Sequence, residues 1–318
     1  MEENKIYDTI VVGGGAAGLT AAIYTCRKKM STLLVTVDIG GQTNLTSHIE
    51  NYPGYTELSG PKLMQIFLDQ AISFGTEVVY GKTEKIEKVG TNFRIKLSND
   101  EEYEGRTLIL AYGKVPRELG IPGEKKFIGR GVSTCATCDA PLFKNKTVAI
   151  VGGGNSALEA ALLSSEFSTK MYLVHRRDAF RGDPITIDKL KTKKNVEFVF
   201  NHIPVEVKGD KFVSGLVIED INTKNQKEIS VNGIFVEIGY IVNTEIVKHL
   251  VKLNDLNEII VSELCETATP GVFAAGDLTD VPYKQTVVSA GEGAKAGMTA
   301  YNYLQELEGK PKAKIDWS

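Results

Sequence analysis

Short apolar runs and longer amphipathic segments alternate along the chain. In the first half, a β-branched run over residues 6–12 leads into glycines and then into helical periodicity over 16–28. An apolar run at 32–37 comes next. Short runs that are apolar throughout are typical of strands buried on both faces. The first forty residues therefore predict a strand–helix–strand unit with a glycine-rich turn after its first strand.

The second half repeats this order. Residues 147–151 form an apolar run, glycines follow, and a helical pattern over 156–167 precedes another apolar run at 171–174. Each half then closes with an apolar strand that runs into glycine, at 107–113 and at 234–239. The matching order predicts two copies of one nucleotide-binding domain rather than a short-period repeat.

Weaker patterns lie between these elements. We expect a polar loop over 39–55 and a helix from about Ser59 to Phe74. Separate short strands are predicted at 102–104 and 107–111, and a meander of strands at 196–229.

The last segment of the chain returns to the first domain. It contains a strand and a Gly-Asp turn within 270–277 and a helix over 289–305, which are too few elements for a third domain. We therefore expect a discontinuous first domain, residues 1–115 and 244–318, and an inserted domain at 116–243. The predicted fold class is α/β, with two Rossmann-like dinucleotide-binding domains of the three-layer ββα type.

Composition and charge narrow the class of partners. The chain has 318 residues, 24% of them charged, and a net charge of −3 with no long run of one sign. Nucleic acid or an anionic membrane would need a basic patch, so neither is expected as a partner. No apolar run approaches the roughly 18 residues of a spanning helix. The acidic first residues do not resemble a signal peptide, and we expect a cytoplasmic protein.

The first glycine turn, Gly13 to Gly18, lies between a strand and a helix, as a dinucleotide fingerprint requires. Its glycines let the backbone approach a pyrophosphate, and the helix N-terminus supplies free N–H groups. A tight turn without a ligand is the alternative, which the second copy disfavours. Asp38, after the second strand, is placed to bind a ribose hydroxyl or to cap a turn. The expected contacts in the turn are Gly13, Gly15, Ala16, Ala17 and Gly18.

The second turn, Gly152 to Ala157, has alanine in place of the third glycine, which the fingerprint tolerates. The strand after it ends in a basic run over 175–181. Arginine at this place binds a 2′-phosphate through two hydrogen bonds, which favours NADPH over NADH. The alternative is a solvated basic turn, because Asp178 is expected to pair with one arginine. The expected contacts are Gly152, Gly154, Asn155, Ser156, His175, Arg176, Arg177 and Arg181.

Cys135 and Cys138 are three residues apart, so on a helix they share a face and can form a disulfide. At a helix start one thiolate would be stabilised. Zinc would need two more ligands, and no second cysteine pair exists, so we expect no metal. Asp139 is placed either to exchange protons with a thiolate or to serve in a turn. Cys26 and Cys265 are expected to be small buried side chains.

The sequence Cys-Ala-Thr-Cys-Asp at 135–139, followed by the second glycine turn and the basic run, resembles the low-molecular-weight thioredoxin reductases. The resemblance spans nearly the whole chain. Further matching segments are Gly41-Gln42, Glu50 to Gly54, Ala274 to Asp277, and Lys284-Gln285-Thr286.

This resemblance implies a homodimer that binds FAD in the discontinuous domain and NADPH in the inserted one. Cys138 would meet the flavin, Cys135 would attack the disulfide of a thioredoxin-like or glutaredoxin-like protein, and Asp139 would be the acid and base. The domains would rotate about hinges near 113–117 and 239–243. Further FAD contacts implied by the resemblance are Gly41, Gln42, Asn51, Gly113, Gly276, Asp277, Lys284, Gln285 and Thr286.

The chain departs from the family pattern at Ala140-Pro141, at Lys284-Gln285-Thr286, where the family usually has Arg-Gln-Ala, and at Gly182-Asp183-Pro184. These positions lie around the dithiol, the flavin edge and the phosphate clamp. Other functions remain open: a flavin-dependent NAD(P)H oxidase, a peroxidase-linked reductase, or a ferredoxin–NADP reductase, which has no need of the dithiol. A non-catalytic redox sensor that binds dinucleotides is a further alternative.

Overall fold

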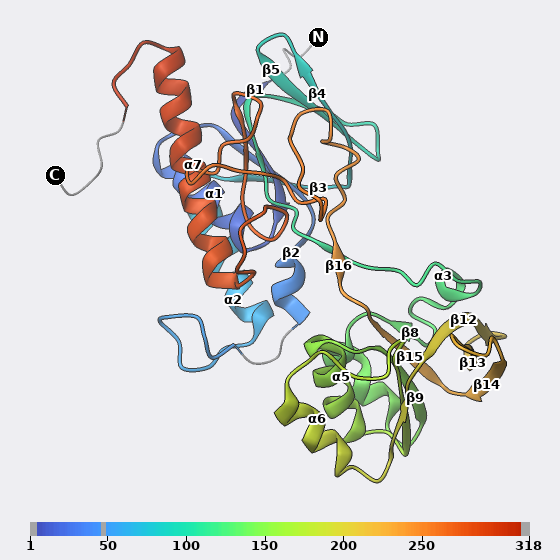
Figure 1. The fold of residues 1–318 in the computed structure, drawn as a ribbon. Helices are drawn as coiled ribbons and strands as arrows, with labels where there is room; N and C mark the ends of the chain where they lie inside the picture. The colour runs from blue at the N-terminus through green and yellow to red at the C-terminus, as the bar shows by residue number, and fades with distance from the viewer. Residues whose placement is uncertain (1–4, 46–48, 313–318) are drawn as a thin grey trace. The chain divides into compact units, whose positions relative to one another are not determined.

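The computed structural model describes residues 5–45 and 49–312, so part of the loop predicted at 39–55 lies outside the described residues. The chain divides into two compact units (Figure 1). Unit 1 is Met1–Lys114 with Val242–Ser318, and unit 2 is Val115–Ile241. The two crossings lie one and two residues from the predicted domain boundaries. Which nucleotide each unit holds stays a prediction.

Unit 1 is built on a mixed sheet covered by helices. Its strands are β1 (Ile6–Gly14), β2 (Thr32–Ile39), β3 (Glu77–Tyr80), β4 (Thr83–Val89), β5 (Asn92–Leu97), β6 (Glu102–Leu110) and β17 (Val272–Ala274). Its helices are α1 (Ala16–Arg27), η1 (Gly41–Leu45), α2 (Gly60–Ser73) and α7 (Thr286–Leu307). Among the described residues the strands lie in the order β3-β2-β1-β6-β5-β4, and β17 also pairs with β6. β4 and β5 are antiparallel to their neighbours, and the other strands run parallel.

Alternate residues of β1 face opposite sides of this sheet. Val11 packs with the residues of α1, α2 and α7, whereas Ile10 and Val12 pack with β4, β5 and the segment after residue 242. Successive side chains of a strand point to opposite faces, so a strand covered on both sides is apolar throughout. Helices on one face and antiparallel strands on the other give the predicted three-layer ββα arrangement.

The prediction of two strands at 102–104 and 107–111 is wrong, because β6 runs without a break. Its first half pairs with β5 and its second half with β17. Gly105 interrupts the apolar pattern but not the pairing. A Cβ at this position would lie 2.8 Å from Ile10 Cγ1, so glycine here lets the neighbouring strand's side chain pack closely.

Unit 2 repeats the plan with a parallel sheet. Its strands are β7 (Val115–Pro116), β8 (Val132–Ser133), β9 (Thr147–Gly152), β10 (Lys170–Val174), β11 (Val196–Val199), β12 (His202–Gly209), β13 (Val213–Asp220), β14 (Gln226–Ser230), β15 (Gly233–Glu237) and β16 (Tyr240–Ile241). Its helices are α3 (Glu124–Phe127), α4 (Ala136–Asp139), η2 (Ala140–Phe143), α5 (Asn155–Ser165) and α6 (Pro184–Lys191). Within the described chain, the parallel sheet has the order β11-β10-β9-β15-β8. Its two faces pack on α5 and on the antiparallel sheet β12-β13-β14. The predicted meander at 196–229 is therefore divided, because β11 joins the parallel sheet.

The two crossings between the units form an antiparallel ribbon of β7 and β16. Tyr240 pairs with Pro116, and Ile241 with Val115. The ribbon continues in a hydrogen bond from the Arg117 N–H to the Gly239 carbonyl at 2.8 Å. Among the described helices, none has the length and apolar character needed to cross a membrane.

Candidate active site

In the first glycine turn, the backbone on the side of the sheet is packed too closely for a side chain (the closed side), whereas the backbone at the start of α1 has free space beside it (the open side). A Cβ at Gly13 would lie 2.4 Å from the Ala111 carbonyl oxygen, and a Cβ at Gly18 would lie 1.8 Å from the Gly13 carbonyl oxygen. A Cβ at Gly15 would have only the Gly40 carbonyl oxygen nearby, at 4.0 Å. The open side carries the first N–H groups of α1, which is where a helix binds a phosphate.

The end of β2 supports this turn through side-chain oxygens. Thr36 Oγ1 accepts the Gly14 N–H at 2.9 Å, and the exposed Asp38 accepts the Gly41 N–H at 3.3 Å. Asp38 thus has the turn-capping contact that was one of its two expected roles. Ala16 and Ala17 have buried side chains, so only their backbone can face a ligand.

Hydrogen bonds connect the other predicted FAD residues, which come from distant parts of unit 1. They lie after the carboxyl ends of the parallel strands, where nucleotides bind in such sheets. Gly113 has φ +66 and faces open space. The connecting bonds are Gln42 to the Lys114 carbonyl (3.4 Å), Thr43 with Thr286 (3.3 Å), Asn51 to Gln285 (3.1 Å) and Ser289 to Asp277 (3.2 Å).

Four buried polar atoms of unit 1 lack a partner among the described residues: Thr9 Oγ1, Asn44 Oδ1, Thr83 Oγ1 and Tyr112 Oη. Leaving such an atom unpaired costs about 1–3 kcal/mol. Asn44 follows β2 and Tyr112 follows β6, at the same carboxyl edge as the glycine turn. Open backbone N–H groups, unpaired polar atoms and the bridged loops together fit a dinucleotide such as FAD.

The second glycine turn has the same plan with different neighbours. A Cβ at Gly152 would lie 2.3 Å from the Glu237 carbonyl oxygen, and one at Gly153 would lie 2.2 Å from His175 Nδ1. Gly154 faces open space. Burial, followed by the charges of nearby arginines, lowers the pKa of His175. The neutral His175 ring therefore packs under the turn.

The basic loop after β10 is held against this turn by its backbone. The Arg181 N–H donates to the Gly153 carbonyl at 2.8 Å, and the side chains of Arg176, Arg177 and Arg181 are exposed. The expected pairing of Asp178 is absent, since no ion pair joins Asp178 to an arginine in the part of the chain that is described. Three free guanidinium groups beside a glycine turn fit a nucleotide that carries a 2′-phosphate.

Asn155 and Ser156 begin α5 directly after the open side of the turn. The Asn155 carboxamide oxygen accepts the Asp183 N–H at 2.7 Å and so anchors the loop that carries the arginines. Ser156 is exposed. The predicted NADPH residues of unit 2 therefore lie around one helix start, and they fit the dinucleotide.

Cys135 and Cys138 form a disulfide with their Cα atoms 5.4 Å apart. Cys135 caps α4, and its Sγ accepts the Cys138 N–H at 3.1 Å. The Ser133 hydroxyl accepts the Cys135 N–H at 3.0 Å, and the Asp139 N–H donates to the Cys135 carbonyl at 3.1 Å. Within the chain Cys138 is exposed, while Cys135 and Asp139 are partly buried.

Unit 1 thus carries one open glycine turn, and unit 2 carries another together with a disulfide. The model of the pyridine nucleotide-disulphide oxidoreductase family matches residues 7–293. The chain belongs to this family.

Solved and curated members of the pyridine nucleotide-disulphide oxidoreductase family share the fold. Lactococcus lactis thioredoxin reductase in its FR conformation has a TM-score of 0.84 and 36% identity, over 94% of this chain and 99% of that one. Thioredoxin reductase of Rickettsia conorii is 38% identical over 93% of this chain and 98% of its own length. One of the subunits of Pseudomonas aeruginosa alkyl hydroperoxide reductase is 40% identical over 94% of this chain. The chain spans only 58% of that last protein.

These relatives confirm the resemblance to the low-molecular-weight thioredoxin reductases and the fold class of two Rossmann-like domains. At the level of the family they also confirm the predicted enzyme class, a flavoprotein oxidoreductase that uses FAD and NADPH.

Cys26 and Cys265 are both buried, as expected for small apolar side chains. Cys26 Sγ lies 3.3 Å from Thr76 Oγ1. Burial raises the pKa of the Cys265 thiol to about 11, so it is a weak nucleophile at neutral pH.

Sequence reasoning missed two buried glutamates of unit 1. The Glu292 carboxylate, in α7, accepts the Gly276 N–H at 2.7 Å and so holds the turn before Asp277. The available signal was a carboxylate flanked by Gly291 and Gly293 in the part of that helix that is rich in alanine and glycine. Glu258 lies 2.8 Å from Lys114 Nζ, and no local pattern marked it.

Glu258 also lies 3.4 Å from Lys284 Nζ, so it connects Lys114 with the residue that departs from the family pattern. Burial alone would raise the pKa of Glu258. Hydrogen bonds from Lys114 and Asn254 and the charges of both lysines overcome this and lower it to about 2. Glu258 is therefore ionised at neutral pH.

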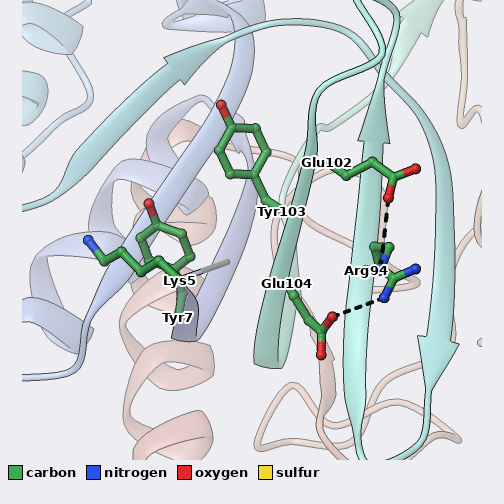
Figure 2. A pocket seen from close by; sticks show the side chains of 6 residues that line it. All are labelled: Lys5, Tyr7, Arg94, Glu102, Tyr103 and Glu104. Carbon is green, nitrogen blue, oxygen red and sulfur yellow. Dashed lines mark hydrogen bonds and ion pairs between the residues drawn. The ribbon is translucent and has the colours of Figure 1, made fainter. Parts of the chain in front are cut away.

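A hollow of about 140 Å³ on the β5 and β6 strands is a poor candidate site (Figure 2). Figure 2 shows Arg94 between Glu102 and Glu104, at 3.9 and 3.2 Å. Lys5 and Tyr7 hydrogen-bond Glu77. The charges of the hollow thus already pair with one another or with Glu77, and the hollow lies at the start of β1, whereas the first glycine turn lies at the end of that strand.

Proposed function

We propose that this chain reduces the disulfide of a thioredoxin-like protein with electrons from NADPH, through FAD and the Cys135–Cys138 dithiol. The observation that carries the proposal is the disulfide at the start of α4, with the Cys138 N–H on Cys135 Sγ, in a chain that has two open glycine turns. A buried structural disulfide would not need an exposed sulfur or an amide aimed at one.

Each cofactor is assigned to one unit by the residues that fit it. FAD and NADPH supply hydride transfer when bound. In unit 1, Gly13, Gly15 and Gly18 would hold the FAD pyrophosphate, and Asp277 the ribitol. In unit 2, Gly152 and Gly154 would hold the NADPH pyrophosphate. The remaining proposed contacts are Asp38, Gly41, Gln42, Asn51, Gly113, Lys284, Gln285 and Thr286 for FAD, and His175, Arg176, Arg177 and Arg181 for NADPH.

The reduced dithiol would work by thiol–disulfide exchange. The Cys135 thiolate attacks one sulfur of the partner's disulfide and forms a mixed disulfide, while the other partner sulfur leaves as a thiolate. The Cys138 thiolate then attacks Cys135 Sγ, which re-forms the internal disulfide and releases the second partner thiol. The Cys138 N–H supports the first step, because an amide donor stabilises the Cys135 thiolate. Asp139 would hold the proton that a leaving thiolate takes up.

Partner, assembly and location are part of the proposal. The Mycobacterium leprae relative named bifunctional thioredoxin reductase/thioredoxin is 38% identical over 96% of this chain, which supports a thioredoxin-like partner. A homodimer in the cytoplasm is proposed from the family resemblance.

A peroxidase-linked reductase is the second candidate. The similarity to the Pseudomonas aeruginosa alkyl hydroperoxide reductase protein, at 40% identity, favours it, and so do Ala140-Pro141 and Lys284, which depart from the thioredoxin reductase pattern. In this reading the same dithiol chemistry would act on a disulfide of a peroxidase system.

The test compares the native protein with Cys135→Ser, Cys138→Ser and the double variant. Under anaerobic conditions NADPH should bleach the flavin absorbance of all four proteins. Only the native protein should reduce thioredoxin, followed with a chromogenic disulfide, and each serine variant should lose at least about a thousandfold in rate. A colourless preparation, or double-variant disulfide reduction at the native rate, contradicts the proposal. Peroxide reduction only with a peroxidase, and none with thioredoxin, would select the second candidate.

A further inference from the structure

The basic run over 175–181 is held by its backbone at two places. Near its start, the Arg177 carbonyl accepts the Asn201 N–H, from the turn between β11 and β12, at 3.1 Å. At its end, the Arg181 N–H donates to the Gly153 carbonyl at 2.8 Å. Between these two bonds, no backbone–backbone hydrogen bond to another described residue holds the middle of the run. The position of the middle therefore depends on its side chains.

Phe180 supplies the contacts that the backbone lacks. Its ring centroid lies 4.7 Å from that of Phe200, 5.4 Å from that of Phe198 and 5.6 Å from the ring of His175. The rings of Phe198 and Phe200 are themselves 6.0 Å apart. Aromatic rings at such distances attract one another. Phe180, Phe198, Phe200 and His175 thus form one aromatic cluster, which packs the middle of the basic run against the end of β11.

The aromatic cluster also reaches the second glycine turn. The His175 side chain is buried, and its Nδ1 lies so close to Gly153 that a Cβ on this glycine would be 2.2 Å away. One side of the cluster therefore supports the turn that would hold a pyrophosphate. The other side, through Phe180, supports the run that carries the arginines. The cluster fixes these two parts of unit 2 relative to each other.

The charges of the basic run make such support necessary. Arg176, Arg177 and Arg181 have exposed side chains within one short loop, and like charges repel. A loop free to move would therefore spread its guanidinium groups apart. Binding a phosphate would then have to order the loop first, and the entropy lost in doing so weakens binding.

We propose that Phe180 is a positioning residue that fixes the basic run through the rings of Phe198 and Phe200, and so determines the preference for a nucleotide that carries a 2′-phosphate. The inference rests on the proposed function, which assigns NADPH to unit 2. A nucleotide with a free 2′-hydroxyl has no phosphate for the arginines to bind. Loosening the run should therefore weaken NADP⁺ binding more than NAD⁺ binding.

The first measurement is limited digestion of the full-length flavoprotein with trypsin, without nucleotide. Mass spectrometry follows the cut after Arg176, whose nearest neighbours in sequence are the same in all variants. A protease cuts a folded loop only after the loop opens, so the rate reports how firmly the run is held. The second measurement is titration calorimetry with NADP⁺ and with NAD⁺. Phe180→Ala is compared with the native protein and with Phe212→Ala, an exposed phenylalanine of the same unit.

We expect trypsin to cut Phe180→Ala after Arg176 about 10-fold faster or more, with the cuts outside the basic run unchanged. The Kd for NADP⁺ should rise about 10-fold and the Kd for NAD⁺ less than about threefold, while Phe212→Ala matches the native protein. An unchanged cutting rate, or equal losses for the two nucleotides, overturns the inference. A native protein that binds neither nucleotide would instead overturn the proposed function, and the trypsin rates would still decide whether Phe180 anchors the run.

Two further variants keep the test decisive if Phe180→Ala does not fold. Phe200→Ala removes the ring nearest to Phe180 and leaves the basic run itself intact. It should shift both measurements in the same direction by a smaller factor, because the contact with Phe198 remains. Phe180→Leu keeps an apolar side chain and should lie between the native protein and Phe200→Ala. Native values in a folded Phe200→Ala protein contradict the role of the cluster.

Discussion

The two glycine turns share a backbone plan but differ in the residues that close them. In unit 1 the third glycine, Gly18, sits so close to the Gly13 carbonyl that no Cβ fits, whereas unit 2 has Ala157 at the equivalent place. A threonine at the end of the second strand supports the first turn, and His175 fills the same place under the second. The close approach of strand and helix is thus achieved differently in each unit, and only the open side is the same.

The ends of the second strands differ in charge. In unit 1 Asp38 is the last but one residue of β2, and in unit 2 three arginines follow β10. A carboxylate at this place suits a ribose hydroxyl and guanidinium groups suit a phosphate. We therefore expect the same backbone arrangement to bind a different dinucleotide in each unit, because this one short segment differs.

The most damaging test exchanges the residues that close the two turns. Gly18→Ala would place a Cβ 1.8 Å from a carbonyl oxygen. We therefore expect the free energy of unfolding to fall by about 3 kcal/mol or more and the purified variant to contain no flavin. Ala157→Gly should cost only about 1 kcal/mol of helix propensity. Thermal unfolding and the flavin absorbance measure both. Equal effects of the two substitutions would remove the distinction between the turns.

Removing the arginines should change nucleotide preference. In Arg176→Ala/Arg181→Ala the kcat/KM for NADPH should fall about 10–100-fold, because charge-assisted hydrogen bonds to a 2′-phosphate are lost. The kcat/KM for NADH should change less than about threefold. Lys191→Ala, on α6, is the control for a lost exposed charge. Equal losses with both nucleotides would place the arginines away from the 2′-position.

Two carboxylates give the units opposite responses to pH. The pKa of Glu258 in unit 1 is lowered to about 2, so its stabilisation is complete above about pH 4.5 and is lost as pH falls toward 2. The pKa of Glu237 in unit 2 is raised to about 7, so the folded state is favoured below about pH 4.5 and this gain is lost as pH rises through 7.

Glu258→Gln should therefore lower stability at pH 7 by on the order of 2 kcal/mol, and Glu237→Gln should raise it at pH 8 by a similar amount. Each difference should fade where the native carboxyl is neutral: below about pH 2 for Glu258 and below about pH 5 for Glu237. Calorimetric scans over this range measure the shifts in Tm. Shifts of the same sign would contradict the assigned environments.

The smallest effect is expected at Asp38. If the main role of Asp38 is to accept the Gly41 N–H, Asp38→Asn keeps an acceptor. The free energy of unfolding should then fall by less than about 0.5 kcal/mol, and the protein should retain its flavin. Asp38→Ala should lower either the free energy of FAD binding or the free energy of unfolding by about 1 kcal/mol. Weaker FAD binding by Asp38→Asn than by Asp38→Ala would contradict the capping role.

The sequence was sufficient for the local elements and insufficient for contacts across them. The apolar runs before Gly13 and Gly152 predicted buried strands, because strands covered on both faces are mostly apolar. The continuity of β6 through Gly105 could not be predicted, since it depends on the side chain of Ile10 in the neighbouring strand. The pairing of Glu258 with Lys114 joins residues 144 positions apart, which no local pattern reports.

The antiparallel ribbon of β7 and β16 has a mechanical consequence. Its strands are the two covalent connections between the units, and backbone pairing ties Val115 to Ile241. Bending at this ribbon must be shared by both strands, so neither connection can lengthen alone without breaking their register. We therefore expect a one-residue insertion after Pro116 to disturb both connections between the units. Deleting one residue after Ile241 in the same protein should not restore the pairing of β7 with β16.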